Sequence, residues 1–190
     1  ANVLTVVATD ALNVSQTVVI NVELDTQLPV LTWFIPTDGS ATNQTIVGVT
    51  GNVDESATLT INGAPILVDA LLDFAGTTTL TEGLNTLTLV ATDVAGNTTS
   101  ETRAVILDAT PPTITVTAPT DGALVNNASV LFSGAVNEPS TLTINGQAVA
   151  VNVAGQFSDA VTLVEGVNAV SIVATDAVGN VSTQAINVNV

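Results

Sequence analysis

Acidic side chains are the groups in this chain with the clearest capacity for chemistry. Its 190 residues include 17 Asp and Glu, and the only Lys or Arg is Arg103, so the net charge is −16. His, Cys, Met and Tyr are absent. A Ser or Thr nucleophile would therefore lack a His or Lys base, and acids repeated on equivalent loops do not make one active site. We expect no enzyme activity.

The excess of negative charge also limits the possible partners. It repels the phosphates of nucleic acids and anionic membrane surfaces, whereas divalent cations are attracted. No run of 18 or more apolar residues occurs, so we expect no membrane insertion. The opening "ANVLTVVATD" lacks the features of a signal peptide, and we expect a soluble fragment of a longer protein.

The acids recur because the chain repeats itself. Residues 25–107 and 108–190 are both 83 residues long, align without a gap and share 32 identical positions. The shared blocks include "PTDG", "TLTING" and "ATD..GN", most of which contain turn residues at fixed offsets. We interpret these two segments, called repeat 1 and repeat 2 below, as two copies of one domain.

Residues 1–24 match the end of the same unit. The "ATD" of residues 8–10 lies 83 residues before the "ATD" of residues 91–93. Asn13 stands where the repeats have Gly96 and Gly179, and Asn tolerates a positive φ, so the turn can survive. We therefore expect residues 1–24 to be the C-terminal hairpin, strands F and G, of a preceding repeat.

Each repeat shows the period-two alternation of half-buried strands separated by Gly, Asn, Asp and Pro turns. We count seven strands, A to G, including a strand and loop over residues 64–76. The pattern predicts an all-β fold of tandem immunoglobulin-like seven-stranded β-sandwiches arranged end to end, without the usual disulfide. The side chains expected inward in repeat 1 include Leu31, Trp33, Ile35, Val47, Val49, Leu59, Ile61, Leu87, Leu89 and Ala91, with Ile114, Val116 and Ala118 as the first-strand counterparts in repeat 2.

The stretches "DATPPTITVTAPTDG", "GAVNEPSTLTINGQ" and "LVEGVNAVSIVATDAVGN" closely resemble bacterial immunoglobulin-like (Big) domains, the tandem modules of large extracellular adhesins. The resemblance covers the whole chain. It implies an extracellular or bacterial cell-surface location, and calcium at or near domain boundaries, as in several such adhesins and in cadherins.

The topology of a seven-strand sandwich sorts the carboxylates, because its loops alternate between the two ends of the domain. At the N-terminal end lie the linker Asp, the Glu of the B–C loop and the Asp of the F–G loop. Ca²⁺ takes six to eight oxygen ligands in flexible geometry, which suits loops. We therefore predict Ca²⁺ ligands at Asp108, Glu138 and Asp176, and then at Asp25, Glu55 and Asp93.

Head-to-tail stacking would add Asp38 and Glu82 to the group around Asp108. The alternative interpretation is that the acids cap turns and keep a lysine-free surface soluble. It is favoured for Asp38 and Asp121, which precede Gly in "TDG". Three acids that occur in one copy only are expected at the surface: Asp69, Asp73 and Asp159.

Two further side chains suggest specific roles. Arg103 occupies an inward phase, so we expect it to pair with an acid such as Glu101 or to extend its charge to the domain rim. Trp33 and Phe34 are neighbours that could form a ligand platform, but Trp33 has the phase of Val116 and is expected in the core, with Phe34 exposed.

The leading hypothesis for function is a stalk segment of a giant adhesin or surface filament, stiffened by Ca²⁺ at domain junctions and contacting neighbouring repeats. The alternative is a carbohydrate- or protein-binding accessory module. Homotypic assembly through sheet edges is also open, because Lys, the usual edge guard, is missing. The sequence does not identify a distal ligand.

Overall fold

A computed structural model describes residues 2–190, which form 18 β-strands. Among these residues no helix has the length and apolar character needed to span a membrane. The chain divides into two compact units that follow the two repeats, except that residues 41–45, 80–85 and 106–107 group with the C-terminal unit. Each repeat carries its own core.

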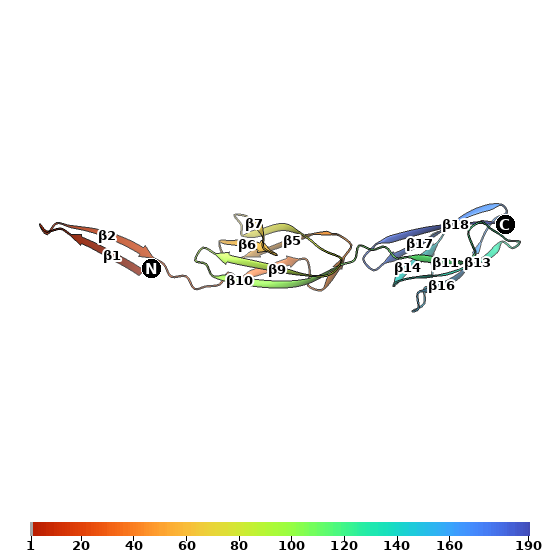
Figure 1. The fold of residues 1–190 in the computed structure, drawn as a ribbon, viewed down its shortest axis with the longest axis horizontal. Coiled ribbons are helices and arrows are strands. Elements are labelled where there is room, and N and C mark those ends of the chain that lie inside the picture. Colours follow the sequence, from red (N-terminus) through yellow and green to blue (C-terminus); the bar gives the residue numbers. More distant parts are fainter. Residues whose placement is uncertain (1) are drawn as a thin grey trace. The chain divides into compact units, whose positions relative to one another are not determined.

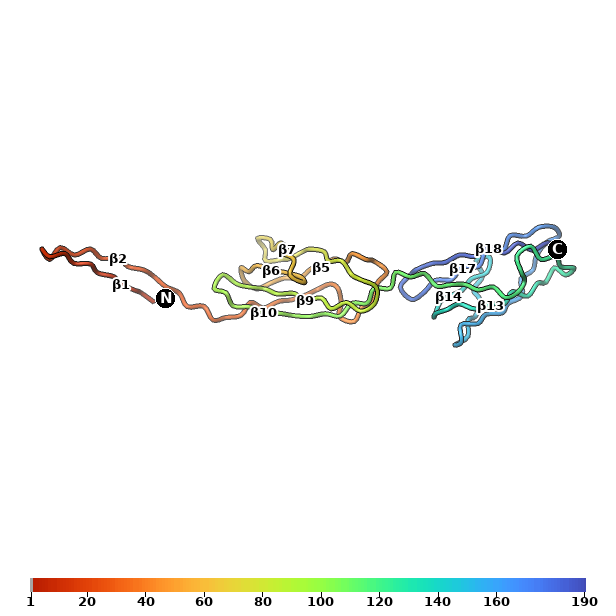
Figure 2. Tube along the Cα trace, in the orientation of Figure 1, coloured from red at the N-terminus to blue at the C-terminus, as the bar shows by residue number. Residues whose placement is uncertain are grey.

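The N-terminal hairpin consists of β1 (Asn2–Thr9) and β2 (Ser15–Val22), which lie side by side in an antiparallel pair (Figures 1 and 2). All residues of both strands are exposed. The expected turn is present, since Asn13 adopts a φ of 57°. The register of the pair, with Leu4 opposite Ile20, repeats that of Val170 opposite Ile186, which lie 166 residues further on.

Repeat 1 contains eight strands, one more than the seven expected. The additional strand is the short β4, which pairs with β10. β7 pairs with both β6 and β8, which joins the two sheets of the repeat in the order β3-β5-β8-β7-β6-β9-β10-β4. The strands are β3 (Leu31–Ile35), β4 (Ser40–Thr42), β5 (Ile46–Val53), β6 (Ala57–Ile61), β7 (Ala64–Val68), β8 (Asp73–Thr79), β9 (Gly83–Asp93) and β10 (Thr98–Leu107).

Repeat 2 has the same eight strands arranged as two separate sheets. One sheet has the order β11-β13-β16 and the other β12-β18-β17-β14-β15. A single bridge between Val151 and Phe157 stands where β7 pairs with β8 in repeat 1. The strands are β11 (Ile114–Ala118), β12 (Ala123–Leu124), β13 (Ser129–Val136), β14 (Ser140–Ile144), β15 (Gln147–Val149), β16 (Gln156–Thr162), β17 (Val167–Asp176) and β18 (Val181–Asn189).

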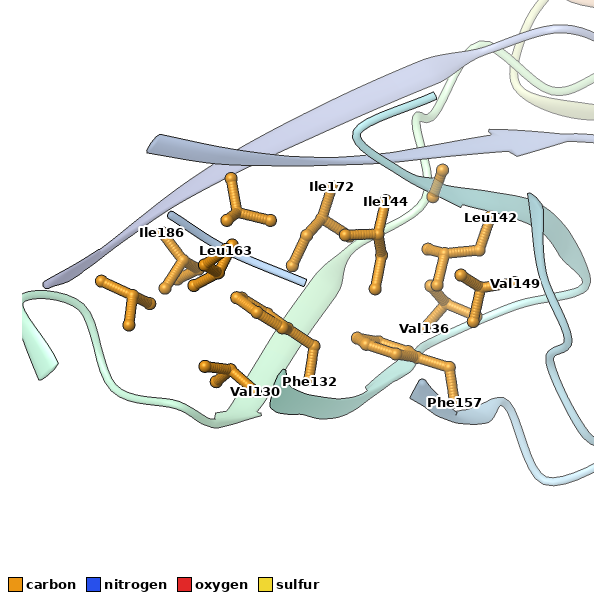
Figure 3. Close-up of a cluster of buried hydrophobic side chains, with 13 residues drawn as sticks. Val130, Phe132, Val136, Leu142, Ile144, Val149, Phe157, Leu163, Ile172 and Ile186 are labelled. Carbon is orange, nitrogen blue, oxygen red and sulfur yellow. The ribbon is translucent and has the colours of Figure 1, made fainter. Parts of the chain in front are cut away.

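Each sandwich encloses a core of aliphatic side chains together with two aromatic rings. In repeat 2, Phe132 on β13 and Phe157 on β16 point toward Ile144 and Ile172 of the opposite sheet (Figure 3). Phe132 and Ile172 have no exposed surface. Because burying such side chains removes roughly 25 cal/mol of unfavourable hydration per Å² of apolar surface, this layer provides the main stabilisation of the fold.

Most positions expected inward are buried, and the exceptions have a common cause. Leu31, Trp33, Leu59, Leu87 and Leu89 are all at most 6% exposed, which confirms the alternation. The prediction was wrong for the last position of the first strand, where Ile35 and Ala118 are exposed. A register shift between Trp33 and Ile35, and between Val116 and Ala118, turns these side chains outward, as β-bulges do.

The hairpin β6–β7 shows why the repeated "ING" blocks matter. Asn62 and Gly63 both have positive φ (48° and 82°), as do Asn145 and Gly146 (50° and 80°). Two-residue hairpin turns with positive φ at both positions match the right-handed twist of the strands, and Asn-Gly meets that requirement. The expected strand is present as β7 and a loop follows it, but β8 already begins at Asp73, so the loop is shorter than expected.

Candidate metal sites

Two carboxylate triads stand at equivalent positions in the two repeats. Each residue of a triad offers one carboxylate oxygen, and these oxygens all lie within 4.8 Å of one another. An aspartate that precedes the first strand of the repeat is joined by a glutamate from the loop before β6 or β14 and by the aspartate that ends β9 or β17. The triads are Asp25, Glu55 and Asp93 in repeat 1, and Asp108, Glu138 and Asp176 in repeat 2.

The aspartate at the end of β9 or β17 is fixed by its own turn. Oδ1 of Asp176 accepts the backbone N–H groups of Val178, Gly179 and Asn180 at 2.8–2.9 Å. Oδ2 of Asp176 accepts Nδ2 of Asn180 at 2.7 Å, and the same amide nitrogen donates to the carbonyl oxygen of Asp108 at 2.8 Å. Asn180 therefore connects two members of the triad.

Repeat 1 has the same arrangement, a clamp in which one Asn donates both to the Asp of the turn and to the Asp before the first strand. Oδ1 of Asp93 accepts the N–H groups of Gly96 and Asn97, and Oδ2 accepts Nδ2 of Asn97 at 2.8 Å. Asn97 also donates to the carbonyl oxygen of Asp25 at 3.3 Å. The Asn belongs to the "GN" that the two repeats share, and its role was not predicted from the sequence. Its spacing of four residues after the Asp, in both copies, is the signal that identifies it.

The glutamates differ from the aspartates, because no turn uses their carboxylates. Among hydrogen bonds between the described residues, none involves the side chain of Glu55 or Glu138. Both side chains are half-buried. Burial, followed by the negative charges of Asp93, Asp25 and Asp54, raises the pKa of Glu55 above its usual value. Burial and then Asp108 and Asp176 raise the pKa of Glu138 in the same way.

The aspartates of the turns shift in the opposite direction. The side-chain hydrogen bond from Asn97 is the largest influence on the pKa of Asp93, and together with the backbone N–H groups it lowers that pKa despite burial. For Asp176, burial raises the pKa most strongly, but the hydrogen bonds from Asn180, Val178 and Gly179 outweigh it and the net shift of the pKa is downward. Each triad thus combines an aspartate whose pKa is lowered with a glutamate whose pKa is raised.

The donor set fits a calcium ion. Calcium–oxygen bonds of 2.3–2.6 Å allow two ligand oxygens to be up to roughly 5 Å apart, and the triad oxygens lie within 4.8 Å of one another. Three carboxylates leave further positions to carbonyl oxygens and water. Calcium binding itself stays a prediction.

The remaining predicted acids include three that make hydrogen bonds of their own and three that are exposed. Oδ1 of Asp38 accepts the N–H of Ala104 at 2.7 Å, and Oδ1 of Asp121 accepts the N–H of Asn187 at 2.7 Å. Both acids therefore fasten the "TDG" turn to the last strand, in agreement with the turn interpretation. Oε2 of Glu82 accepts the N–H of Ala109 in the linker at 3.1 Å. The single-copy acids expected at the surface, Asp69, Asp73 and Asp159, are exposed.

Arg103 has a role that neither expectation described. Its guanidinium donates to the backbone carbonyl oxygens of Trp33, Phe34 and Pro36 and lies 4.7 Å from the centroid of the Trp33 ring. Glu101 is not among its partners in the described part of the chain, so the expected pairing was wrong. Trp33 is 5% exposed and Phe34 57% exposed, which confirms the core and surface assignments.

The fold places both repeats among immunoglobulin-like modules. Three immunoglobulin domains of titin superpose with a TM-score of 0.55 over 85% of this chain and 65% of that one, at 9% identity. Weaker likenesses include fibronectin(III)-like modules of Clostridium thermocellum CbhA (TM-score 0.49, 15% identity, 85% and 94% covered). Another is a structure from a study of host cell surface retention of a 1.5-MDa bacterial ice-binding adhesin (TM-score 0.45, 22% identity, 98% and 73% covered).

The chain belongs to the glucodextranase domain B family, whose model matches residues 29–109 and again residues 112–190. A curated relative is Bacillopeptidase F of Bacillus subtilis (strain 168), 32% identical over 157 residues, which are 78% of this chain and 11% of the relative. The chain thus spans about one tenth of that relative's length. The family takes its name from one domain of glucodextranase. The resemblance to the Big domains of adhesins remains an expectation.

Proposed function

We propose that this chain is a structural spacer of an extracellular bacterial protein, built from non-catalytic immunoglobulin-like modules and stiffened by calcium at the two triads. The observation that carries the proposal is the pair of half-buried glutamates, Glu55 and Glu138, each beside two aspartates. No turn accounts for them, and the only Lys or Arg of the chain is engaged elsewhere. Burial and then repulsion from the aspartates raise their pKa values, and a divalent cation would offset that repulsion.

The position of the triads gives calcium a mechanical role. Asp108 lies in the linker directly after β10, and its N–H donates to the carbonyl oxygen of Thr42 at 2.9 Å. Its carboxylate belongs to the triad formed with Glu138 and Asp176 of repeat 2. Asp25 precedes β3, the first strand of repeat 1, in the same way. An ion held by such a triad would tie a linker residue to the domain that follows it and reduce the freedom of the linker.

The N-terminal hairpin supports a longer array. Its register equals that of β17 and β18, and Oδ1 of Asp10 accepts the N–H groups of Leu12 and Val14 as Oδ1 of Asp176 does for Val178 and Asn180. Its exposed apolar face corresponds to the buried face of β17 and β18. We propose that residues 1–24 are the last hairpin of a further module. Val14 replaces the clamping Asn, so Asp10 lacks that partner.

The proposal is tested by following unfolding and dimensions in calcium and in chelator. A calcium concentration about 100 times the Kd stabilises a folded domain by about 2.7 kcal/mol, which corresponds to a rise in Tm on the order of 10 °C. Small-angle scattering should show a narrower distribution of end-to-end distances with calcium. Unchanged Tm and dimensions at millimolar calcium would refute the metal-stiffened spacer.

A second candidate function is a binding module for carbohydrate or protein. The observation that favours it is the exposed ring of Phe34, which lines a groove of about 660 Å³ in repeat 1. Glycan-array binding that disappears in Phe34→Ala would support a carbohydrate ligand. This function and the spacer are compatible, because the groove and the triads use different residues.

A further inference from the structure

The groove of repeat 1 has an apolar floor and an acidic margin. Phe74, which is 1% exposed, and Gly51 belong to its floor, whereas Phe34 is 57% and Leu67 85% exposed. Exposed large apolar side chains around a hollow are typical of a binding surface. The groove is lined by Phe34, Thr50, Gly51, Leu67, Val68, Asp69, Asp73, Phe74 and Ala75.

Repeat 2 provides the matched comparison, because a groove of about 540 Å³ is lined by the nine residues found 83 positions later. The floor is retained there, with Gly134 and Phe157. The margin is not: the aromatic ring, the leucine and both carboxylates are replaced by small or neutral side chains. The four exchanges are Phe34 to Thr117, Leu67 to Ala150, Asp69 to Asn152 and Asp73 to Gln156.

One of the two acids is already partly used by the fold. Oδ1 of Asp69 accepts the N–H groups of Leu71 and Asp73, and Asn152 makes the equivalent bonds to Ala154 and Gln156. The turn therefore requires a side-chain oxygen at this position but not a charge. The negative charges of Asp69 and Asp73 are specific to repeat 1 and are not explained by the turn.

We propose that the groove of repeat 1 binds an arginine or lysine side chain on a partner protein. This rests on the second candidate function and not on the calcium spacer. The aliphatic stem of such a residue packs against Leu67 and the ring of Phe34, and its charge is neutralised by Asp69 and Asp73. A planar guanidinium also stacks on an aromatic ring, which favours arginine.

A second copy of this chain does not fit as the partner. Its only Lys or Arg is Arg103, which is occupied by the Trp33 ring and three backbone carbonyl oxygens. The cation must therefore come from outside this chain, and we assign it to a partner protein. The net charge of −16 accelerates the approach of a basic partner but does not place it, because that charge is spread over the whole chain.

The test uses the whole chain, once in excess calcium and once in chelator, so that any binding of the probe at the triads is recognised. The probe is the peptide acetyl-Leu-Arg-Leu-Arg-amide, and its neutral counterpart has citrulline in place of both arginines. Amide chemical shifts report where each peptide binds. The key variant is F34T/L67A/D69N/D73Q, which gives the first groove the margin of the second. The reciprocal variant is T117F/A150L/N152D/Q156D.

We expect shift changes around Gly51, Phe74 and Asp73 with the arginine peptide and at least tenfold weaker binding of the citrulline peptide. The first variant should lose these changes, and the reciprocal variant should gain them around Gly134 and Phe157. Equal responses to both peptides, or responses spread over all acidic surfaces, would overturn the proposal. Binding of neutral glucan oligosaccharides at the groove, with none of the arginine peptide, would overturn it in favour of a carbohydrate ligand.

Discussion

The guanidinium of Arg103 lies 4.7 Å from the centroid of the Trp33 ring, so the only Lys or Arg of the chain serves the core of repeat 1. Repeat 2 has Ile186 and Val116 at these two positions, both aliphatic. In repeat 1 the arginine additionally satisfies carbonyl oxygens of the first strand and of Pro36. The aromatic–cation pair is therefore a structural replacement and not a ligand platform.

Replacing Arg103 with Met should destabilise repeat 1 by about 2 kcal/mol. Met retains an apolar stem but removes the hydrogen bonds from a charged donor and the contact with the ring, which are worth about 1–3 kcal/mol each before relaxation and solvation. Urea unfolding measures the loss. Glu101→Gln is the matched control and should change stability little, because Glu101 is not among the partners of Arg103. A large loss of stability in the control would instead support an ion pair between Arg103 and Glu101.

Gly51→Ala should be severely destabilising, whereas Gly48→Ala on the same strand should be tolerated. A Cβ at Gly51 would lie 2.2 Å from the carbonyl oxygen of Thr32 and 2.3 Å from the Phe74 ring, but at Gly48 its nearest neighbour is Ile35 Cδ1 at 3.7 Å. Overpacking of this kind costs about 1–3 kcal/mol or more. Thermal unfolding of the two variants distinguishes them, and similar midpoints would contradict the close approach.

Much of the fold follows from local patterns. The alternation that buries Leu87, Leu89 and Ala91 is visible in the sequence, as are the Asn-Gly turns. What periodicity could not predict is a change of phase. The bulge after Trp33 turns Ile35 outward, and nothing in "LTWFIP" distinguishes that register from a regular strand. The short β4 was missed because three residues show no period.

The triads could be grouped from the sequence because strand order alone decides which loops share an end of the sandwich. The hydrogen-bond partners of those acids could not be predicted from the sequence. Asn97 and Asn180 each contact two acids through one amide nitrogen, a relation that depends on where the linker crosses the F–G turn. The role of Arg103 was missed because a contact with backbone carbonyl oxygens leaves no charged partner to find.

Asp121→Asn should reduce the sensitivity of repeat 2 to acid. The backbone N–H of Asn187, then its side chain, lowers the pKa of Asp121 in the folded state. A carboxyl that binds its proton more weakly when folded stabilises the protein above its unfolded pKa, near 3.8, and loses that contribution as the pH falls through the folded pKa. Urea midpoints between pH 6 and pH 2 should therefore fall less steeply for the variant. If the urea midpoint falls with pH equally steeply in the variant and the natural chain, Asp121 does not contribute to the acid sensitivity.

Glu138→Gln should have opposite effects in chelator and in calcium. The raised pKa means that the folded state holds the proton more tightly, so in chelator the contribution of Glu138 favours folding below its unfolded pKa, near 4.5, and is lost as the pH rises through the folded pKa. Gln imitates the protonated form. At pH 7 in chelator the variant should unfold a few degrees higher than the natural chain.

In saturating calcium the order should reverse, because Gln removes one of three charged ligands and with it most of the calcium-dependent rise in Tm. Glu165→Gln, at an exposed glutamate of the same repeat outside the triad, removes the same charge and is the control. It should leave the calcium-dependent rise intact. The Tm difference between variant and natural chain should change sign between chelator and calcium for Glu138→Gln but not for Glu165→Gln. This distinguishes a metal ligand from a surface acid, since loss of a surface charge shifts the Tm in the same direction in both conditions.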